Sequence, residues 1–216
     1  MIERIPEELR GLYAHLNRSV RLYASLRWRL CPFEMIEGHV PESGVILDVG
    51  CGYGLLSNLI ALRGKDRRVT GVDLSAKRIG VAQSTIRGRE NIRFVEQDVN
   101  DLVLDACDAV IMSDFLHHIP LDVVRKLLVN VSEKMAQDGL LIIQDVDRKP
   151  RWKSWVAVGI DRSMNIGKKL YHRSRAELQS LLEDIGFCVE SFPVHKGLPL
   201  SDVLFLGKKR TVKRET

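Results

Sequence analysis

Short apolar runs alternate with amphipathic segments from Val45 onward. The apolar runs predict strands, and the segments between them repeat apolar residues at helical spacing, which predicts helices. The predicted strands span residues 45–49, 68–73, 92–96, 108–112, 139–146, 187–192 and 202–208, and the predicted helices span 55–63, 75–87, 120–136 and 173–185, with a short turn at 101–106. This alternation is typical of a parallel sheet covered by helices on both faces, so the pattern predicts an α/β fold.

Several residues predict where helices begin and end. Pro120 suits a first helical turn, and Gly139 is expected to end the helix that follows it. Ser174, with Glu177 three residues later, has the spacing of a capping box, and Gly186 is expected to close that helix.

Two segments fall outside the alternation. Residues 7–37 carry apolar residues at helical spacing and predict one or two amphipathic helices packed across the domain. Residues 148–172 combine tryptophans with many cations and follow the fifth strand. We therefore expect a helical cap at 1–40, a main domain at 41–208 with an acceptor-side insertion at 148–172, and a frayed basic tail at 209–216.

Length and composition favour one α/β domain with a full core, since the chain has 216 residues, 45% of them hydrophobic. The charged residues near Met1 do not resemble a secretory signal, and no apolar run is long enough to span a membrane, so we expect a cytoplasmic protein. The four cysteines lack Cys-x-x-Cys spacing. They predict reduced, mostly buried thiols, with no metal site and no disulfide framework.

The formal net charge of +5 is compatible either with a solvated surface or with an anionic partner. The basic residues are concentrated between Arg148 and Arg175, where Asp161 is the single acid. Arginines also alternate with aromatic residues in the N-terminal segment. Such mixtures can bind a carboxylate, a phosphate, a carrier-protein helix or a membrane surface, or can form the solvated face of a packed helix.

The predicted strand at 45–49 contains Asp48 near its end and is followed by glycines at positions 50, 52 and 54. Glycine lacks a Cβ and tolerates positive φ, so this sequence predicts a sharp turn whose backbone can approach a ligand. The helix that follows would direct its N-terminus toward that ligand.

Two acids follow the next two strands at the same edge of the predicted sheet. Asp73 lies 23 residues after Gly50, a spacing at which a carboxylate can accept hydrogen bonds from both hydroxyls of an adenosine ribose. Asp98 could accept from an exocyclic amine, with Val99 beside the adenine. The alternatives are a helix cap for Asp73, although Ser75 can fill that role, and an ordinary loop acid for Asp98.

Four motifs together resemble those of class I S-adenosylmethionine-dependent methyltransferases. They are residues 47–54 (Leu-Asp-Val-Gly-Cys-Gly-Tyr-Gly), 72–75 (Val-Asp-Leu-Ser), 97–99 (Gln-Asp-Val) and 113–120 (Ser-Asp-Phe-Leu-His-His-Ile-Pro). The resemblance covers residues 45 to about 208. It implies a three-layer sandwich with a seven-stranded, mostly parallel sheet ordered 3-2-1-4-5-7-6, the last strand antiparallel, plus the N-terminal helices.

The resemblance also implies how S-adenosylmethionine, and its product S-adenosylhomocysteine, would be bound. The glycine loop would lie against the methionine part, Asp73 would hold the ribose, Asp98 and Val99 would meet the adenine, and Asp48 would help orient the amino acid end. The implied cofactor-binding residues are Asp48, Gly50, Cys51, Gly52, Gly54, Asp73, Leu74, Asp98, Val99 and Ser113. A nicotinamide dinucleotide is the alternative, but it requires a third glycine at position 55, which is a leucine.

A base is needed only where the methyl acceptor must lose a proton, since a sulfonium already carries its leaving group. The candidates are His117, His118, Tyr171 and His172. The adjacent histidines should not point the same way from an extended stretch, and packing or cofactor contact is favoured over proton transfer.

The leading hypothesis is an enzyme that methylates a small-molecule or lipid-like acceptor, anionic or carrier-bound, at oxygen by in-line SN2 displacement. Methylation at carbon or nitrogen stays open. One alternative is an RNA or protein methyltransferase that docks through the basic segment, although no nucleic-acid-binding motif supports it. Another is a noncatalytic cofactor-binding partner subunit. The sequence indicates no oligomeric state.

Overall fold

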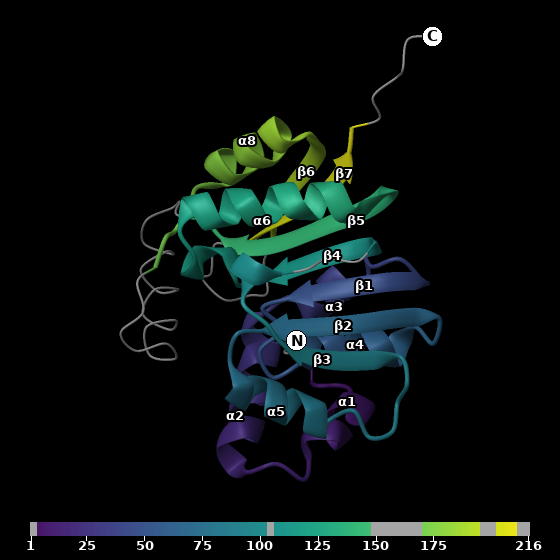
Figure 1. Ribbon diagram of the computed structural model, residues 1–216. Helices are drawn as coiled ribbons and strands as arrows, with labels where there is room; N and C mark the ends of the chain where they lie inside the picture. The colour runs from purple at the N-terminus through teal and green to yellow at the C-terminus, as the bar shows by residue number, and fades with distance from the viewer. Residues whose placement is uncertain (1–3, 103–105, 148–169, 195–201, 211–216) are drawn as a thin grey trace.

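A computed structural model of the protein describes residues 4–102, 106–147, 170–194 and 202–210 (Figure 1). Seven strands form one sheet in the order β3-β2-β1-β4-β5-β7-β6, which confirms the expected topology. Their bounds are β1 Gly44–Val49, β2 Arg67–Asp73, β3 Ile92–Glu96, β4 Cys107–Ser113, β5 Met135–Val146, β6 Phe187–Val194 and β7 Asp202–Lys209. Strand β7 is antiparallel to both β5 and β6, and β1 to β5 pair in parallel.

Helices cover both faces of the sheet and complete the three layers. The helices are α1 Glu7–Tyr13, α2 Arg18–Leu30, α3 Phe33–Glu37, α4 Leu55–Arg63, α5 Ala76–Ser84, α6 Leu121–Lys134 and α8 Arg175–Ile185, with short 3₁₀ helices η1 Val99–Asp101 and η2 Leu116–His118. One core cluster joins α1 to α5 to the sheet, and a second joins α6 and α8 to its other face.

The alternation of side chains along the central strands explains why both faces need cover. In β4, Ala109 and Ile111 belong to the first cluster, whereas Val110 and Met112 belong to the second. All four are fully buried. A strand that is apolar on both faces is stable only between two layers of helices.

The capping predictions for α8 are confirmed. The Ser174 and Glu177 side chains each bond the other residue's backbone in a capping box, and Gly186 ends the helix with φ of 106°. Ser75 likewise caps α5 by accepting from the Arg78 backbone N–H.

Two predictions about α6 are wrong. Pro120 is the residue before the helix, with an extended ψ of 157°, rather than part of its first turn. Gly139 does not end the helix, because the chain leaves the helical conformation at Met135 and Gly139 lies within β5. Met135 is buried and pairs with Cys107, after which the register shifts and pairing resumes at Ala109 with Leu140. This early pairing extends the strand.

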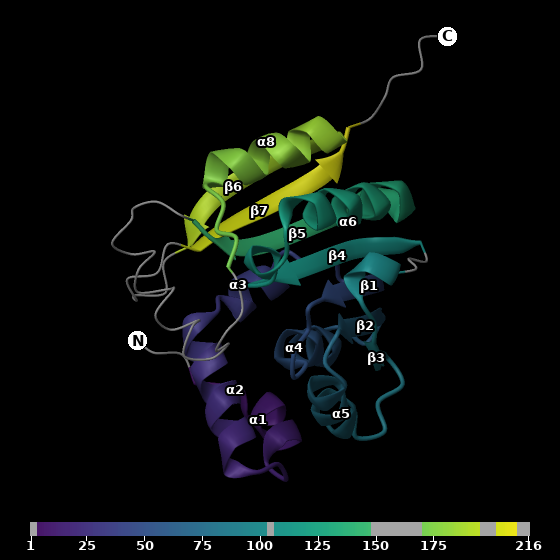
Figure 2. The same ribbon diagram turned by 60° about the vertical axis from the view of Figure 1, so that its left-hand side comes forward.

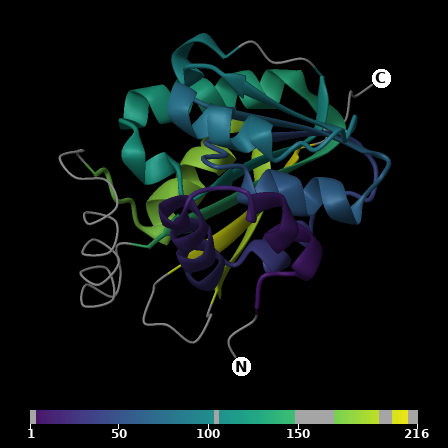
Figure 3. The same ribbon diagram turned by 90° about the horizontal axis from the view of Figure 1, so that it is seen from below.

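The N-terminal segment folds into three helices rather than one or two. Asn17 caps α2 by accepting from the Val20 N–H, and Pro32 separates α2 from α3. In Figures 1 and 2, α1 and α2 lie together at the end of the molecule opposite α8. Seen from below, they lie in front of the strands (Figure 3).

Some expectations concern residues outside the described ranges. These are most of the insertion at 148–172, most of the tail at 209–216, part of the cap at 1–40 and part of the predicted turn at 101–106. Among the described helices, none has the length and apolar composition needed to cross a membrane.

Candidate functional site

A cavity of about 270 Å³ lies where the parallel strands β1, β2 and β4 end. Its lining includes ten of the residues proposed from the sequence: Asp48, Gly50, Cys51, Gly52, Asp73, Leu74, Asp98, Val99, Ser113 and His118. The carboxyl edge of an open α/β sheet is where ligands bind in this architecture.

The three glycines of the loop after β1 all have positive φ, but they serve different purposes. Gly50 and Gly54 have φ of 78° and 76°, and a Cβ would meet Phe115 at Gly50 and Phe94 at Gly54. Gly54 is not among the described residues that line the cavity, so its role here is to pack and to start α4. Gly52 has φ of 57°, and a Cβ there would find open space. Gly52 is therefore the glycine whose open side is available to a ligand.

Asp73 fastens the glycine loop to the end of β2. Its carboxylate accepts from the Gly52 N–H at 3.0 Å and from the Ser75 N–H at 2.9 Å. The Arg78 guanidinium lies 3.7 Å away. The carboxylate that was proposed to hold a ribose thus also fixes the loop beside it.

Asp48 lies beneath this loop and is 2% exposed. Burial raises the pKa of its carboxyl group to about 6. The hydrogen bond that the carboxylate accepts from Ser57 Oγ at 2.5 Å acts in the opposite direction and lowers this pKa, but burial has the larger effect. Burial and the nearby carboxylates of Asp48 and Asp73 also raise the pKa of the Cys51 thiol well above its usual range. Cys51 is therefore a neutral thiol and not a nucleophile.

Asp98 caps the 3₁₀ helix η1. Its Oδ1 atom accepts from the Asn100 backbone N–H and from Asn100 Nδ2, both at 2.8 Å. The loop conformation that follows β3 keeps Asp98, Val99 and Asn100 together on the cavity wall.

The N-terminal helices, which the sequence predicted to pack across the domain, contribute one wall of the cavity. Tyr23 of α2 lines the cavity, and its ring meets that of Tyr53 edge to face, with centroids 4.8 Å apart. The Tyr13 hydroxyl of α1 donates to the Tyr53 carbonyl at 2.8 Å. Arg27 of α2 forms an ion pair with Asp114, the residue after β4. The i to i+4 spacing of Tyr23 and Arg27 was the signal that these side chains share a helix face.

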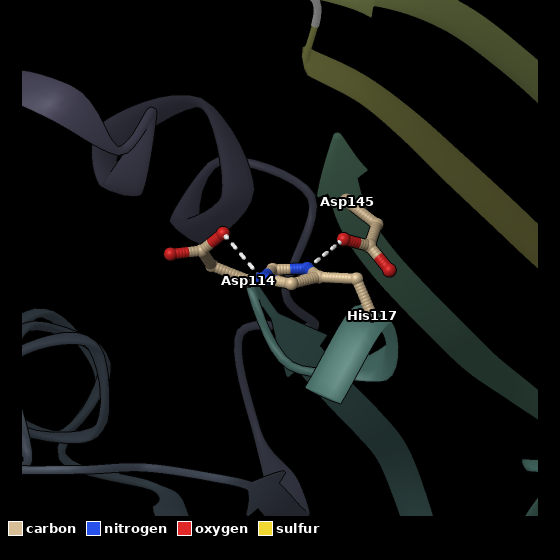
Figure 4. A group of neighbouring side chains, drawn as sticks. All are labelled: Asp114, His117 and Asp145. Atoms are coloured by element: carbon tan, nitrogen blue, oxygen red, sulfur yellow. Dashed lines mark hydrogen bonds and ion pairs between the residues drawn. The ribbon is translucent and has the colours of Figure 1, made fainter. Parts of the chain in front are cut away.

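His117 lies between two carboxylates (Figure 4). Its Nδ1 atom is hydrogen-bonded to Asp145 Oδ1, and its Nε2 atom is 3.8 Å from Asp114 Oδ1. Burial alone would raise the pKa of Asp114, but the charges of Arg27 and His117 outweigh it and hold that pKa below its usual range. Asp114 is therefore ionised.

Asp114, His117 and Asp145 offer ligand atoms within 4.8 Å of one another, a spacing that a cation could use. Arg27 already neutralises Asp114, however, and the imidazole already bonds Asp145. A guanidinium beside a cation is unfavourable, so the cluster is best described as an ion network. Nearby, burial and the charges of Asp114 and Asp145 raise the pKa of Asp202 to about 7.

The expectation that the two adjacent histidines point apart is wrong. They lie on the 3₁₀ turn η2 rather than on an extended strand, and their ring centroids are 4.1 Å apart. The His172 ring stacks on His117 with centroids 5.3 Å apart. Of these three histidines, only His118 is among the described residues that line the cavity.

The segment that precedes α8 holds the η2 turn. Arg173 donates to the carbonyls of Leu116 and Ile119, each at 2.9 Å, and the Tyr171 N–H donates to the His117 carbonyl at 2.8 Å. Within the described structure, Tyr171 contributes its backbone here, and its ring is not among the residues that line the cavity. Ser113 lines the cavity while donating to Gln144 Oε1.

Comparison with known proteins gives a family match and several relatives. A family model described as a methyltransferase domain matches residues 46–139. A ubiquinone biosynthesis O-methyltransferase from Coxiella burnetii is 32% identical over 130 residues, which cover 59% of this chain and 54% of that protein. A protein of the same name from Aeromonas salmonicida is 27% identical over 172 residues, which cover 76% of this chain and 71% of that protein. The chain thus spans about half the length of the Coxiella relative.

Among solved structures, a magnesium protoporphyrin IX methyltransferase from Synechocystis PCC 6803 with bound SAH superimposes with a TM-score of 0.65. The alignment has 21% sequence identity and covers 94% of this chain and 93% of that one. At this identity the likeness concerns the fold.

Proposed function

We propose that this chain, which contains a class I S-adenosylmethionine-dependent methyltransferase domain, transfers a methyl group to an oxygen atom of a small-molecule or lipid-like acceptor. The observation that carries the proposal is the arrangement around Asp73. Its carboxylate lies at the cavity wall, holds the Gly52 N–H and adjoins the one loop glycine that is open to a ligand.

We assign the cavity residues to the parts of S-adenosylmethionine. Gly50 and Gly52 would meet the methionine part, Asp73 the ribose hydroxyls, and Asp98 with Val99 the adenine. Leu74 is 66% exposed although it lines the cavity, which suits an apolar contact that a bound adenosine would cover. When bound, S-adenosylmethionine supplies a methyl group on a sulfonium, which is its own leaving group.

The chain's own residues would align the acceptor, exclude water and accept a proton. Alignment alone can lower the barrier by roughly 7–11 kcal/mol where it is ideal. In the net reaction the acceptor oxygen forms a bond to the methyl carbon, the carbon–sulfur bond breaks, and a hydroxyl acceptor releases its proton. We assign His118 as the base that accepts this proton, because the His118 side chain lines the cavity. His117, in contrast, is buried between two carboxylates.

The acceptor class rests on two observations. The curated relatives named above are O-methyltransferases, which supports oxygen as the acceptor atom. Tyr23, Phe33 and Phe115 give the cavity an aromatic side, which suits a flat or apolar acceptor. A carrier-bound acceptor, or a contact with a membrane surface, would use the basic segment that follows β5.

Calorimetry with S-adenosylmethionine, S-adenosylhomocysteine and NAD tests the cofactor. We expect micromolar binding of the first two and none of NAD, and a loss of at least about tenfold in affinity for Asp73→Asn. Asp66→Asn is the matched control, because Asp66 is exposed on the turn before β2. Binding of NAD alone, or unchanged affinity in Asp73→Asn, would overturn the assignment.

A second experiment tests the acceptor. Release of S-adenosylhomocysteine would be measured with pools of phenols, with carboxylic acids, with RNA and with a protein extract. Turnover on the phenol or carboxylate pool supports the proposal. Turnover on RNA that weakens steeply with salt would favour an RNA methyltransferase. Cofactor binding without turnover on any pool would favour a noncatalytic subunit.

A further inference from the structure

A second cavity, of about 560 Å³, lies beside the N-terminal helices. We call it the α1–α2 groove. Its described lining includes the apolar side chains of Ile5, Tyr13, Leu22 and Leu55, and the arginines Arg18 and Arg21. None of the residues proposed from the sequence as catalytic or cofactor-binding lines it.

Within the described residues, Arg18 and Arg21 have no acidic partner, whereas Arg10, which also lines the groove, lies 3.8 Å from Glu7. In the described ranges, no ion pair or side-chain hydrogen bond engages Arg18 or Arg21. The surrounding sequence explains this, because five arginines and no Asp or Glu lie between Leu9 and Phe33. Arg27 of this set is neutralised by Asp114 in the interior. The groove thus offers guanidinium groups that suit a carboxylate or phosphate.

The apolar part of the groove includes one exposed side chain. Leu22 is 71% exposed and lies four residues after Arg18, on the same side of α2. Tyr13 and Leu55 also line the cavity, although each is only 4% exposed. Apolar walls beside unpaired guanidinium groups match a ligand with an apolar body and an anionic head.

The groove is distinct from the cavity of about 270 Å³ at the ends of β1, β2 and β4, which we call the cofactor cavity. At 100° per residue, Arg18, Arg21 and Leu22 lie on one side of α2, and Tyr23 and Arg27, which line the cofactor cavity, lie on the other. Leu55 lines both cavities, so the two are neighbours. A ligand in the groove would therefore not occupy the position of the reacting groups.

We propose that the α1–α2 groove binds one molecule of an anionic amphiphile, a carboxylate or phosphate monoester joined to an apolar body. The guanidinium groups of Arg18 and Arg21 bind the anionic head, and Leu22, Tyr13 and Leu55 contact the apolar body. This site is independent of the proposed methyl transfer.

The test is a calorimetric titration of the full chain with monomeric dodecyl phosphate. We expect saturable binding with one site, and at least about tenfold weaker binding of inorganic phosphate, which lacks the apolar body, and of dodecyl maltoside, which lacks the charge. Arg18→Glu with Arg21→Glu should weaken dodecyl phosphate binding by at least about tenfold. The matched control is Arg125→Glu with Lys126→Glu on the exposed side of α6, which should leave it unchanged.

Three results would overturn the proposal. They are the absence of saturable binding, an equal loss in the α6 control, and equally tight binding of dodecyl maltoside. Vesicles of phosphatidylglycerol distinguish a membrane headgroup from a free molecule, because binding to vesicles without binding of monomeric dodecyl phosphate would contradict a one-molecule site. Affinity for S-adenosylhomocysteine is measured in both double variants and should be unchanged, so that a fault in the cofactor assignment is detected separately.

Discussion

At the scale of single residues, the buried carboxyl group of Asp48 makes the stability of the fold depend on pH. The carboxyl group is buried below the glycine loop, where its charged form is poorly solvated, and Ser57 Oγ supplies a single side-chain hydrogen bond. A native pKa near 6 against an unfolded value near 3.8 means that the folded state binds the proton more tightly. Asp48 is the next-to-last residue of β1, a central strand of the sheet, and this position buries its side chain below the loop.

The pH dependence of stability follows from this shift. Because the folded pKa is raised, the contribution of Asp48 to stability is complete below about pH 4 and is lost as pH rises through about 6, by roughly 3 kcal/mol. Asp48→Asn should remove this loss while its side-chain oxygen still accepts from Ser57. Urea unfolding near pH 4 and near pH 8 should show a smaller loss in the variant than in the wild type. Asp138→Asn, on the exposed part of β5, is the control, and an equal pH dependence in wild type and Asp48→Asn would contradict the argument.

The sequence predicted the residues of the glycine loop but not their separate purposes. Positive φ at all three positions follows from glycine chemistry. Gly54 makes room for Phe94, and Gly50 makes room for Phe115. These purposes depend on contacts between segments that are distant in the sequence, so the sequence did not predict them. The same holds for Arg27 and Asp114, which are 87 residues apart and carry no local signal of pairing.

At the scale of elements, the ion pair between Arg27 and Asp114 joins α2 to the end of β4. Both side chains are largely buried, at 17% and 19% exposed. Removing one partner of a fully buried pair costs about 3–5 kcal/mol, because the other charge loses its compensation. For this partly buried pair we expect Arg27→Met to lower the free energy of unfolding by about 2 kcal/mol.

A double-mutant cycle tests this pair. Asp114→Asn combined with Arg27→Met should recover part of the loss, and asparagine tolerates the positive φ of 54° at this position. Arg29→Met, on the exposed side of α2, should have little effect. Strictly additive effects of the two substitutions would show that the pair contributes no coupling.

The capping box of α8 is the element that sequence analysis predicted in most detail. Ser174→Ala removes the acceptor for the Glu177 N–H and should lower the free energy of unfolding by about 1 kcal/mol. Ser180→Ala, within the same helix and exposed, should be neutral or slightly stabilising because alanine favours the helix. Urea unfolding of both variants checks this, and equal effects of the two would argue against a capping role. The prediction that Gly139 ends α6 was wrong, in contrast, because the pairing of β5 with β4 begins before Gly139 and overrides the local tendency of glycine to end a helix.

For the whole molecule, periodicity alone predicted an α/β fold, whereas the strand order came from the motif resemblance. Local patterns place strands and helices, but parallel neighbours depend on crossovers that no local pattern encodes. The sequence predicted one or two N-terminal helices where the structure has three. Their contacts with Tyr53 could not be predicted, because these depend on how α1 and α2 pack against α4 and the loop.

The cofactor cavity draws on β1, β2, β4, α2 and η1, so a ligand bound there should stabilise the molecule as a whole. At a concentration of about 100 times its Kd, S-adenosylhomocysteine should add about 2.7 kcal/mol, which for a chain of this size raises Tm by about 5–10 °C. NAD at the same concentration should leave Tm unchanged. The shift should be abolished in Asp73→Asn and retained in Asp66→Asn, as measured by differential scanning calorimetry. A shift that survives in Asp73→Asn would place the ligand elsewhere on the molecule.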